Sequence, residues 1–286
     1  MINIKSIIIG TANFFQDYGI NNSLINNKEK KRIYNYLKKK QIFDFDISDS
    51  YGKYYEDRNF LEIKKKKINY KFKLKNFDNN LSDILIKLRV KKLECLMIHD
   101  ENELTSKKNI IKFNKIKKLN KKKKFFRTIG VSVYTVGCLI NIINNNIKVD
   151  VVQLPLNIFN QAFDHNHILK KLKKKKIKIH VRSLFLQGLL LKNSNNIFNK
   201  LLKKKMINFE NLVKKNNSKK IDLCIDYIKT VKYVDKVILG FDSLQQLQTI
   251  IKVLDKKKKN IDYNQFCNIK TKFVDPRKWK KILVSS

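Results

Sequence analysis

Eight short apolar runs alternate along this chain with longer segments of helical periodicity. The runs cover residues 6–9, 42–47, 68–74, 93–98, 125–131, 149–154, 177–181 and 237–239. Between them, apolar residues recur at helical spacing, for example at Val136, Leu139, Ile140 and Ile143, and at Leu244, Leu247, Ile250, Ile251 and Leu254. Continuously apolar strands that alternate with helices indicate a parallel sheet covered by helices.

The number of strands favours a closed barrel over an open, doubly wound sheet. A doubly wound sheet usually carries a Gly-rich phosphate loop after its first strand. Here the first run leads into Gly10-Thr11-Ala12-Asn13, without a GxGxxG pattern. We therefore expect an α/β fold, a (β/α)₈ TIM barrel, as a single domain over residues 1–286, with residues 257–286 as a C-terminal tail.

The net charge of +40 raises the question of a nucleic-acid partner, because basic proteins attract phosphate backbones. The excess is mostly Lys in a chain also rich in Asn, Ile, Phe and Tyr, residues that share A/T-rich codons. The Lys runs lack the interleaved aromatic residues that stack on bases, and they cover residues 64–67, 121–124, 173–176 and 256–259. We expect solvated helix ends and loops there, and no specific nucleic-acid partner.

The four cysteines, Cys95, Cys138, Cys224 and Cys267, show no CxxC spacing. This predicts reduced, buried thiols and no metal site. The apolar run within residues 1–10 is too short for a secretory signal, and no apolar stretch has the length of a membrane span. We expect a cytoplasmic protein without a membrane partner; its oligomeric state does not follow from these residues.

Four polar residues follow consecutive predicted strands, where a barrel collects its active site. Asp46 and Tyr51 belong to the second strand end, Lys73 to the third and His99 to the fourth. These residue types suit the reduction of a carbonyl, in which a proton must reach the oxygen as negative charge builds there. A Lys lowers the pKa of a nearby phenol, a carboxylate holds that Lys, and a His orients the carbonyl.

The chain resembles the aldo-keto reductase family over nearly its whole length. The family's motifs occur in order as Ile9-Gly10-Thr11-Ala12, Asp46 with Tyr51-Gly52, Lys73, Ile98-His99-Asp100, Ile129-Gly130-Val131-Ser132, residues 149–159, Arg182-Ser183 with Gln187-Gly188, residues 237–240 with Ser243 and Gln246, and Asp275-Pro276-Arg277-Lys278-Trp279. Each motif alone is weak, and their order and spacing together carry the resemblance.

The resemblance implies an NAD(P)H-dependent oxidoreductase that reduces a small aldehyde or ketone, with a sugar or sugar derivative among the candidates. It implies a catalytic set of Asp46, Tyr51, Lys73 and His99, with Tyr51 as general acid. It assigns cofactor contacts to Ser132, Gln153, Arg182, Ser183, Gly240, Ser243 and Gln246. NADPH is the first expectation and NADH stays open, because Gly240 and Gln246 stand where many members have Lys and Arg.

Three points stay open at this level. Lys71, Lys73 and Lys75 share one strand face, so the register decides which is catalytic. Asp44 and Asp49 compete with Asp46. The alternative function is a catalytically silent barrel that binds the cofactor as a regulatory or interaction subunit; the intact catalytic set argues against it.

Overall fold

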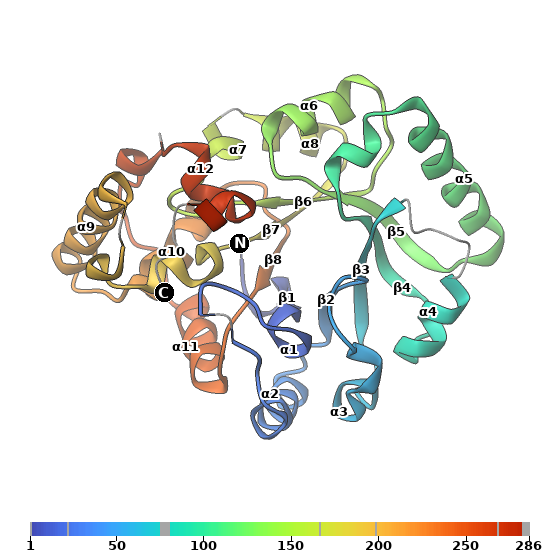
Figure 1. The fold of residues 1–286 in the computed structure, drawn as a ribbon, viewed down its shortest axis with the longest axis horizontal. Helices are drawn as coiled ribbons and strands as arrows, with labels where there is room; N and C mark the ends of the chain where they lie inside the picture. The colour runs from blue at the N-terminus through green and yellow to red at the C-terminus, as the bar shows by residue number, and fades with distance from the viewer. Residues whose placement is uncertain are drawn as a thin grey trace.

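The computed structural model describes residues 2–21, 23–74, 81–165, 167–197, 199–267 and 269–281. Eight parallel strands close into a barrel in chain order, which confirms the expected TIM barrel (Figure 1). The strands are β1 (Ile7–Gly10), β2 (Asp44–Ser48), β3 (Lys67–Phe72), β4 (Leu93–Ile98), β5 (Phe126–Ser132), β6 (Val151–Pro155), β7 (Lys178–Arg182) and β8 (Lys236–Leu239). Each of the eight predicted runs contains one of these strands or overlaps it.

Helices connect the strands and surround the barrel. The α-helices are α1 (Ala12–Phe15), α2 (Asn27–Lys39), α3 (Arg58–Leu61), α4 (Leu81–Leu88), α5 (Lys107–Lys123), α6 (Val136–Asn144), α7 (Ala162–His165), α8 (Ile168–Lys174), α9 (Lys200–Lys215), α10 (Lys220–Thr230), α11 (Leu244–Asp255) and α12 (Thr271–Val274). Short 3₁₀ turns are η1 (Ile4–Ser6), η2 (Tyr54–Glu56), η4 (Glu101–Leu104), η5 (Leu186–Leu191), η6 (Ser194–Asn196), η7 (Asn264–Phe266) and η8 (Pro276–Lys281).

Polar residues fix where several helices begin. Ser106 accepts a hydrogen bond from Asn109 N at the start of α5, and Ser243 accepts one from Gln246 N at the start of α11. Such N-caps satisfy amide groups that have no partner inside the helix. On α11 the expected apolar face is buried, whereas on α6 Ile140 is 41% exposed, so the expected face of that helix is only partly correct.

Two apolar layers hold the fold together. The large core lies between the outer faces of the strands and the helices, and a separate small cluster of Cys95, Met97 and Val151 fills the barrel interior. Gly130 brings strands β5 and β6 close together, since a Cβ there would lie 2.6 Å from the carbonyl oxygen of Val151. Packing of this kind keeps the strand ends in fixed relative positions, as a site built from several strands requires.

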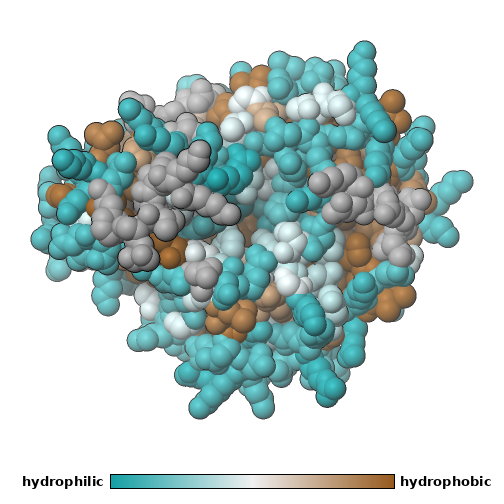
Figure 2. Space-filling model, viewed as in Figure 1, coloured by the Kyte–Doolittle hydropathy of each residue, from teal (hydrophilic) through white to brown (hydrophobic). Residues whose placement is uncertain are grey.

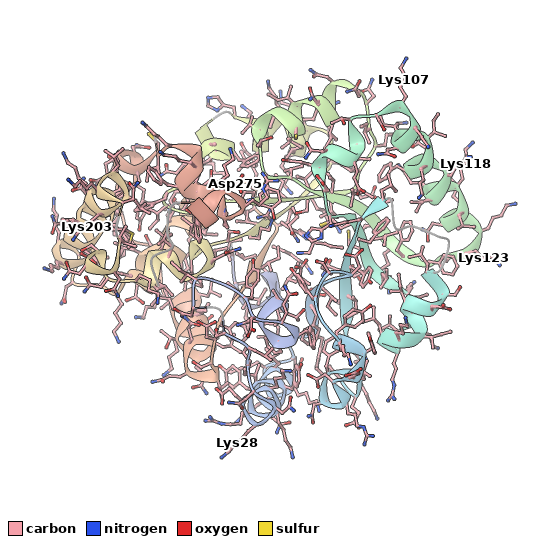
Figure 3. The ribbon with its side chains drawn as sticks, viewed as in Figure 1. Lys28, Lys107, Lys118, Lys123, Lys203 and Asp275 are labelled. Atoms are coloured by element: carbon pink, nitrogen blue, oxygen red, sulfur yellow. The ribbon has the colours of Figure 1, made fainter. Side chains whose placement is uncertain are left out.

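The face shown in Figure 2 is mostly hydrophilic, with small groups of hydrophobic side chains among the hydrophilic ones. Lys28 on α2, Lys107, Lys118 and Lys123 on α5, and Lys203 on α9 point away from the barrel (Figure 3). Within the residues that the structure describes, no helix is long and apolar enough to cross a membrane. In the same residues no group of three or more His, Cys, Asp or Glu side chains is placed to hold a metal ion.

Candidate active site

An ion pair inside the barrel joins β2 to β3. Lys71 Nζ lies 2.7 Å from Asp46 Oδ2, and the side chains are 5% and 3% exposed. The register sets Ser48 opposite Lys71 and Asp46 opposite Asn69, so all four residues face the interior. Burial lowers the pKa of Lys71, but Asp46 and Tyr51 raise it by more, so the pKa lies above its ordinary value and the ammonium stays charged.

The third member of this cluster is Tyr51, in the turn after β2. Lys71 Nζ donates a hydrogen bond of 3.0 Å to the Tyr51 hydroxyl. Gly52 seats the turn against the end of α1, where a Cβ would lie 2.0 Å from the carbonyl oxygen of Phe15. Burial raises the pKa of Tyr51, Lys71 lowers it and Asp46 raises it again, to a net value of about 12. Burial therefore outweighs Lys71, and the phenol is protonated at neutral pH.

The structure corrects the choice of lysine made from the sequence. Lys71, and not Lys73, contacts Asp46 and Tyr51. Strand β3 ends at Phe72, and the backbone N–H of Lys73 donates to Asp49 Oδ2 outside the ladder. Residues two apart on a strand are separated by about 6.6 Å along its axis, so Lys73 lies above the level of the cluster. Lys75 lies outside the described residues.

Asp44 and Asp49, the competitors of Asp46, are engaged elsewhere. Asp44 pairs with Lys236, and Asp49 accepts the Lys73 amide. Of these three, Asp46 alone therefore has its carboxylate beside Lys71 and Tyr51.

His99 follows β4 and lines the same cavity. Its Nδ1 is 3.0 Å from Ser48 Oγ, and its backbone N–H donates to Phe72 O. Burial, together with the charges of Lys71 and Arg182, lowers the pKa of His99 to about 3. The imidazole is therefore neutral at physiological pH and is positioned by Ser48.

The second oxygen of Asp46 is held from β6. Gln153 Nε2 donates to Asp46 Oδ1 at 2.9 Å, and Ser132 Oγ donates to Gln153 Oε1 at 3.3 Å. Both carboxylate oxygens of Asp46 are thus fixed, one by Lys71 and the other by Gln153. Gln153 is fully buried and is not among the residues that line the cavity, and its amide supports Asp46.

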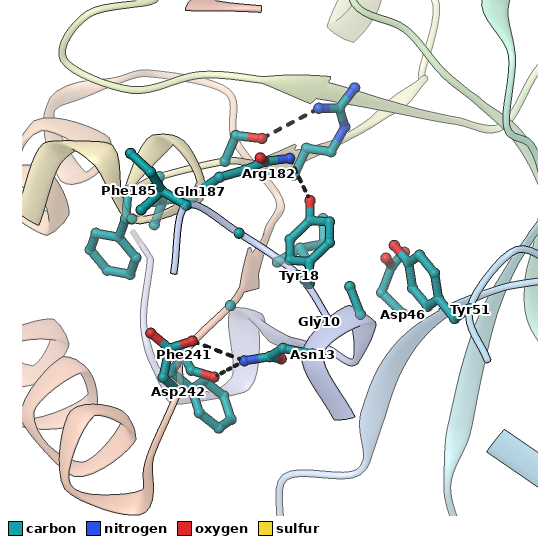
Figure 4. A pocket seen from close by; sticks show the side chains of 18 of the residues that line it. Gly10, Asn13, Tyr18, Asp46, Tyr51, Arg182, Phe185, Gln187, Phe241 and Asp242 are labelled. Atoms are coloured by element: carbon teal, nitrogen blue, oxygen red, sulfur yellow. Dashed lines mark hydrogen bonds between the residues drawn. The ribbon is translucent and has the colours of Figure 1, made fainter. Parts of the chain in front are cut away.

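A cavity of about 300 Å³ opens above these residues. It extends from Tyr51 and Asp46 to Phe241 and Asp242 after β8 (Figure 4). On one side Gln187 Nε2 donates to the Tyr18 hydroxyl at 3.0 Å, and Ile20 N donates to Gln187 O. The segment after β1 and the segment after β7 therefore meet across the cavity.

The end of the cavity near β8 is lined by the carboxylate of Asp242, whereas nearby Glu29 is paired with Arg32. Asp242 Oδ1 accepts a hydrogen bond from Asn13 Nδ2 at 3.1 Å (Figure 4). Glu29 Oε1 accepts one from Leu244 N, in the first turn of α11. Gln246 Oε1 accepts the amide of Asp242, and Gly240 leaves open space, since a Cβ there would meet nothing within 4 Å.

The expected cofactor residues divide into two groups. Five of the seven line the cavity, namely Ser132, Arg182, Ser183, Gly240 and Gln246. The other two are outside its wall: Gln153 holds Asp46, and Ser243 caps α11. The contacts of these two side chains are with neighbouring protein groups, and their assignment to the cofactor stays a prediction.

Arg182, at the end of β7, extends toward the segment after β5. Its guanidinium carbon lies 4.0 Å from the centre of the Tyr134 ring. Its NH2 group donates to Val133 O at 3.1 Å, and its NH1 group donates to Ser183 Oγ at 3.3 Å. Arg182 thus has a defined position at the cavity wall, next to the His99 end.

Four residues of this region were not predicted from the sequence. Asp242 and Tyr134 directly follow strands, so a wider search of strand ends could have found them. Tyr18 comes from the irregular segment after α1, and Arg277 belongs to the tail motif and to η8, but nothing in the sequence places either residue at this region. Arg277 joins the region because its guanidinium carbon lies 3.6 Å from the centre of the Tyr134 ring.

Comparison with known families gives a match over most of the chain. The model of the aldo/keto reductase family matches residues 6–270. Comparison with curated protein sequences gave no significant match.

Solved structures with a similar fold include aldo-keto reductases. The glycerol dehydrogenase AKR11B4 from Gluconobacter oxydans is 15% identical at a TM-score of 0.66, over 91% of this chain and 89% of that one. The thermostable aldo-keto reductase Tm1743, solved with the inhibitor epalrestat, is 13% identical at 0.62, over 91% and 93%. PA4992 from Pseudomonas aeruginosa, provisionally described as an aldo-keto reductase, is 13% identical at 0.62, over 87% and 89%. At these identities the likeness shows the fold.

Proposed function

Because the chain belongs to the aldo/keto reductase family of oxidoreductases, we propose that it reduces a small aldehyde or ketone, with Tyr51 as the proton donor. Sugars and sugar derivatives are among the candidate substrates. The observation that carries this proposal is that one ammonium, that of Lys71, contacts both Asp46 and the Tyr51 hydroxyl.

The proton chemistry follows from the charges around Tyr51. A phenol with a pKa of about 12 holds its proton at neutral pH, yet it donates readily to an alkoxide, which is a much stronger base. The phenolate that remains lies 3.0 Å from the Lys71 ammonium. Lys71 therefore stabilises the product side of the proton transfer, and Asp46 keeps that ammonium in place.

His99 completes the site as a neutral group. Since its pKa is about 3, it neither repels Lys71 nor competes with Tyr51 as an acid. A neutral imidazole held by Ser48 can orient the carbonyl oxygen by a hydrogen bond. This division makes Tyr51 the donor and His99 the positioning group.

The cavity fits a nicotinamide cofactor in two respects. It is elongated from Tyr51 to the start of α11, and the hydroxyls of Ser132 and Ser183 lie in its wall near the catalytic end. Gly240 leaves space at the other end. When bound, the reduced nicotinamide supplies the hydride, and the residues described above place the carbonyl and deliver the proton.

The preference between NADPH and NADH remains a prediction. Resemblance favours NADPH, whereas the local charge favours NADH, because the carboxylate of Asp242 lines the cavity near β8 and no Lys or Arg of the described wall lies there. A carboxylate repels a 2′-phosphate. Direct titration decides: tighter binding of NADPH supports the expected preference, and tighter binding of NADH overturns it. Asp242→Asn should shift the affinity ratio toward NADPH.

The proposed function is tested by cofactor oxidation with a panel of aldehydes and ketones, together with direct cofactor titration by fluorescence. We expect binding of at least one cofactor and turnover of at least one carbonyl compound. Binding without turnover across the panel would favour the alternative, a regulatory barrel. Absence of binding to either cofactor would contradict the proposal.

A further inference from the structure

The ring of Tyr134 lies between two arginines from distant parts of the chain. The guanidinium carbon of Arg182 is 4.0 Å from the ring centre, and that of Arg277, in η8, is 3.6 Å away. Two planar groups this close to one ring centre cannot share a face, so the guanidiniums stack on opposite faces. Cations are attracted to both faces of an aromatic ring. The segment near the C-terminus therefore braces a residue of the cavity wall.

The two arginines differ in how their charges are balanced. Arg277 donates from Nε and NH2 to the two oxygens of Asp275, and its NH1 lies 3.8 Å from Glu101 Oε1. Arg182 has neutral acceptors, Val133 O and Ser183 Oγ. Among the ion pairs of the described residues, none includes Arg182. One guanidinium is thus neutralised and the other is not.

Arg182 also has hydrogen-bond donors to spare. A guanidinium carries five N–H groups, and the contacts of Arg182 to Val133 and Ser183 use one from each terminal nitrogen. Within the described part of the chain, the remaining N–H groups of Arg182 have no acceptor. The residue also lines the cavity. The fork geometry of these donors suits the two oxygens of a carboxylate.

The other charges at this end of the cavity balance out. Lys71 is paired with Asp46, and His99 is neutral at physiological pH because its pKa is about 3. Arg182 lies close enough for its charge to contribute to that low pKa. Among the described residues that line the cavity, Arg182 is therefore the cation without a carboxylate partner.

We propose that Arg182 is a specificity residue that binds a carboxylate of the carbonyl substrate, so that the protein prefers aldehydes or ketones bearing an acid group over neutral ones. Tyr134 holds the guanidinium at the wall, and Arg277 braces Tyr134 from behind. This inference rests on the proposed function, and it differs from the expectation that Arg182 serves the cofactor.

The test compares each acid with its methyl ester, which removes the negative charge, and the same ratio in Arg182 variants corrects for the other differences between the two. Each of glyoxylate, 4-oxobutanoate and 5-oxopentanoate is measured against its methyl ester, because the reach from the carbonyl to Arg182 selects one chain length. For the best pair we expect kcat/KM of the acid to exceed that of the ester by roughly tenfold or more, with the preference weakening as salt is raised. In Arg182→Met the acid-to-ester ratio should fall to about one, and Arg182→Lys should be intermediate.

Arg277→Met is the matched control, since it removes a guanidinium from the same ring but leaves the charge of Arg182; its acid-to-ester ratio should stay clearly above one. A second readout is calorimetric binding of the hydroxy-acid product, such as 4-hydroxybutanoate, to the cofactor-loaded protein. We expect Arg182→Met to weaken it at least tenfold, roughly the worth of one charged hydrogen-bonded contact.

The outcomes separate this inference from the proposed function. If the wild-type protein reduces acids and esters equally well, or Arg182→Met leaves the ratio unchanged, the carboxylate site is refuted while the reductase stands. If Arg182→Met weakens cofactor binding and the wild-type ratio is one, Arg182 is a cofactor residue and the inference fails. If no carbonyl compound is turned over, the proposed function fails. The binding measurement still tests the anion site: weaker hydroxy-acid binding in Arg182→Met supports it, and unchanged binding refutes it.

Discussion

The ammonium of Lys71 lies 3.0 Å from the hydroxyl of Tyr51, and this contact links two strand ends that are 20 residues apart in the chain. It determines which lysine can act on the proton donor. It also explains why the buried phenol of Tyr51 can release its proton during the reaction. The Lys71 ammonium beside the oxygen stabilises the phenolate that forms.

Replacing Lys71 should therefore damage catalysis far more than replacing Lys73. We expect Lys71→Met to lower kcat by about 10² or more with nearly unchanged cofactor affinity, and Lys73→Met to change kcat little, because Lys73 lies outside the cluster. Steady-state kinetics and cofactor titration measure both.

Folding must be controlled in this experiment. Lys71→Met leaves Asp46 as an unpaired buried charge, which costs about 3–5 kcal/mol of stability. The double variant Asp46→Asn/Lys71→Met removes both charges, so it should recover stability without recovering activity. Loss of activity in Lys73→Met, with Lys71→Met active, would show that the register of β3 differs from the one described.

The activity of the reductase should be nearly independent of pH over the neutral range. The pKa of Tyr51 is about 12 and that of His99 about 3. Tyr51 is protonated below its pKa and loses its proton only as the pH rises through about 12, whereas His99 becomes charged only as the pH falls toward 3. We expect kcat/KM for reduction to be flat from about pH 5 to pH 9, outside both titrations. A break between pH 6 and 7 that disappears in His99→Gln would contradict this account.

Gly52 should be required for the position of Tyr51. An added Cβ would lie 2.0 Å from the carbonyl oxygen of Phe15, so Gly52→Ala must shift the turn that carries the proton donor. A displacement of about 1 Å can cost on the order of 10² in rate. Gly137→Ala is the matched control, since a Cβ there meets nothing within 4 Å. Equal kcat for the two variants would show that the turn tolerates the shift.

His180 should make stability depend on pH. It is 4% exposed on β7, and burial, together with the charge of Lys236, lowers its pKa from 6.5 to about 3. Between these values the unfolded chain binds a proton that the folded chain does not, so the free energy of unfolding rises with pH in this window. We expect His180 to contribute about 1.4 kcal/mol per pH unit near pH 5.

Urea unfolding at pH 5, 6 and 7 measures this slope. His180→Leu removes the titrating group, so the slope should decrease by roughly that amount. An unchanged slope in this variant would mean that His180 does not stay neutral in the folded barrel.

The barrel could be predicted from the sequence because its strands are short, apolar and bounded by polar segments. Asp46 in the second strand, and Tyr51 and His99 just after the second and fourth, were chosen because they lie at strand ends. The sequence alone could not show which lysine contacts Tyr51, because Lys71 and Lys73 lie on the same face of the predicted strand. The pairing register of β3 with β2, which sets Lys71 opposite Ser48, distinguishes the two. Side-chain periodicity gives the face of a strand, and it does not give the height along the barrel axis.

The contacts of Gln153 and Arg277 could not be predicted from the sequence for another reason. Gln153 was expected at the cofactor, but its amide is used by Asp46, 107 residues away in the chain. Arg277 is far from Tyr134 in the chain, and no local pattern predicts that their side chains stack. Contacts between such distant segments depend on how loops close over the barrel, which spacing does not encode.

The central claim is that the Tyr51 hydroxyl delivers the proton, and Tyr51→Phe tests it most directly. This change keeps the ring and removes only the hydroxyl that Lys71 contacts, so stability should change by about 1 kcal/mol and cofactor binding should persist. Single-turnover reduction of the best carbonyl substrate should become slower by about 10² to 10⁴. A Tyr51→Phe protein that reduces this substrate at the wild-type rate would contradict the account.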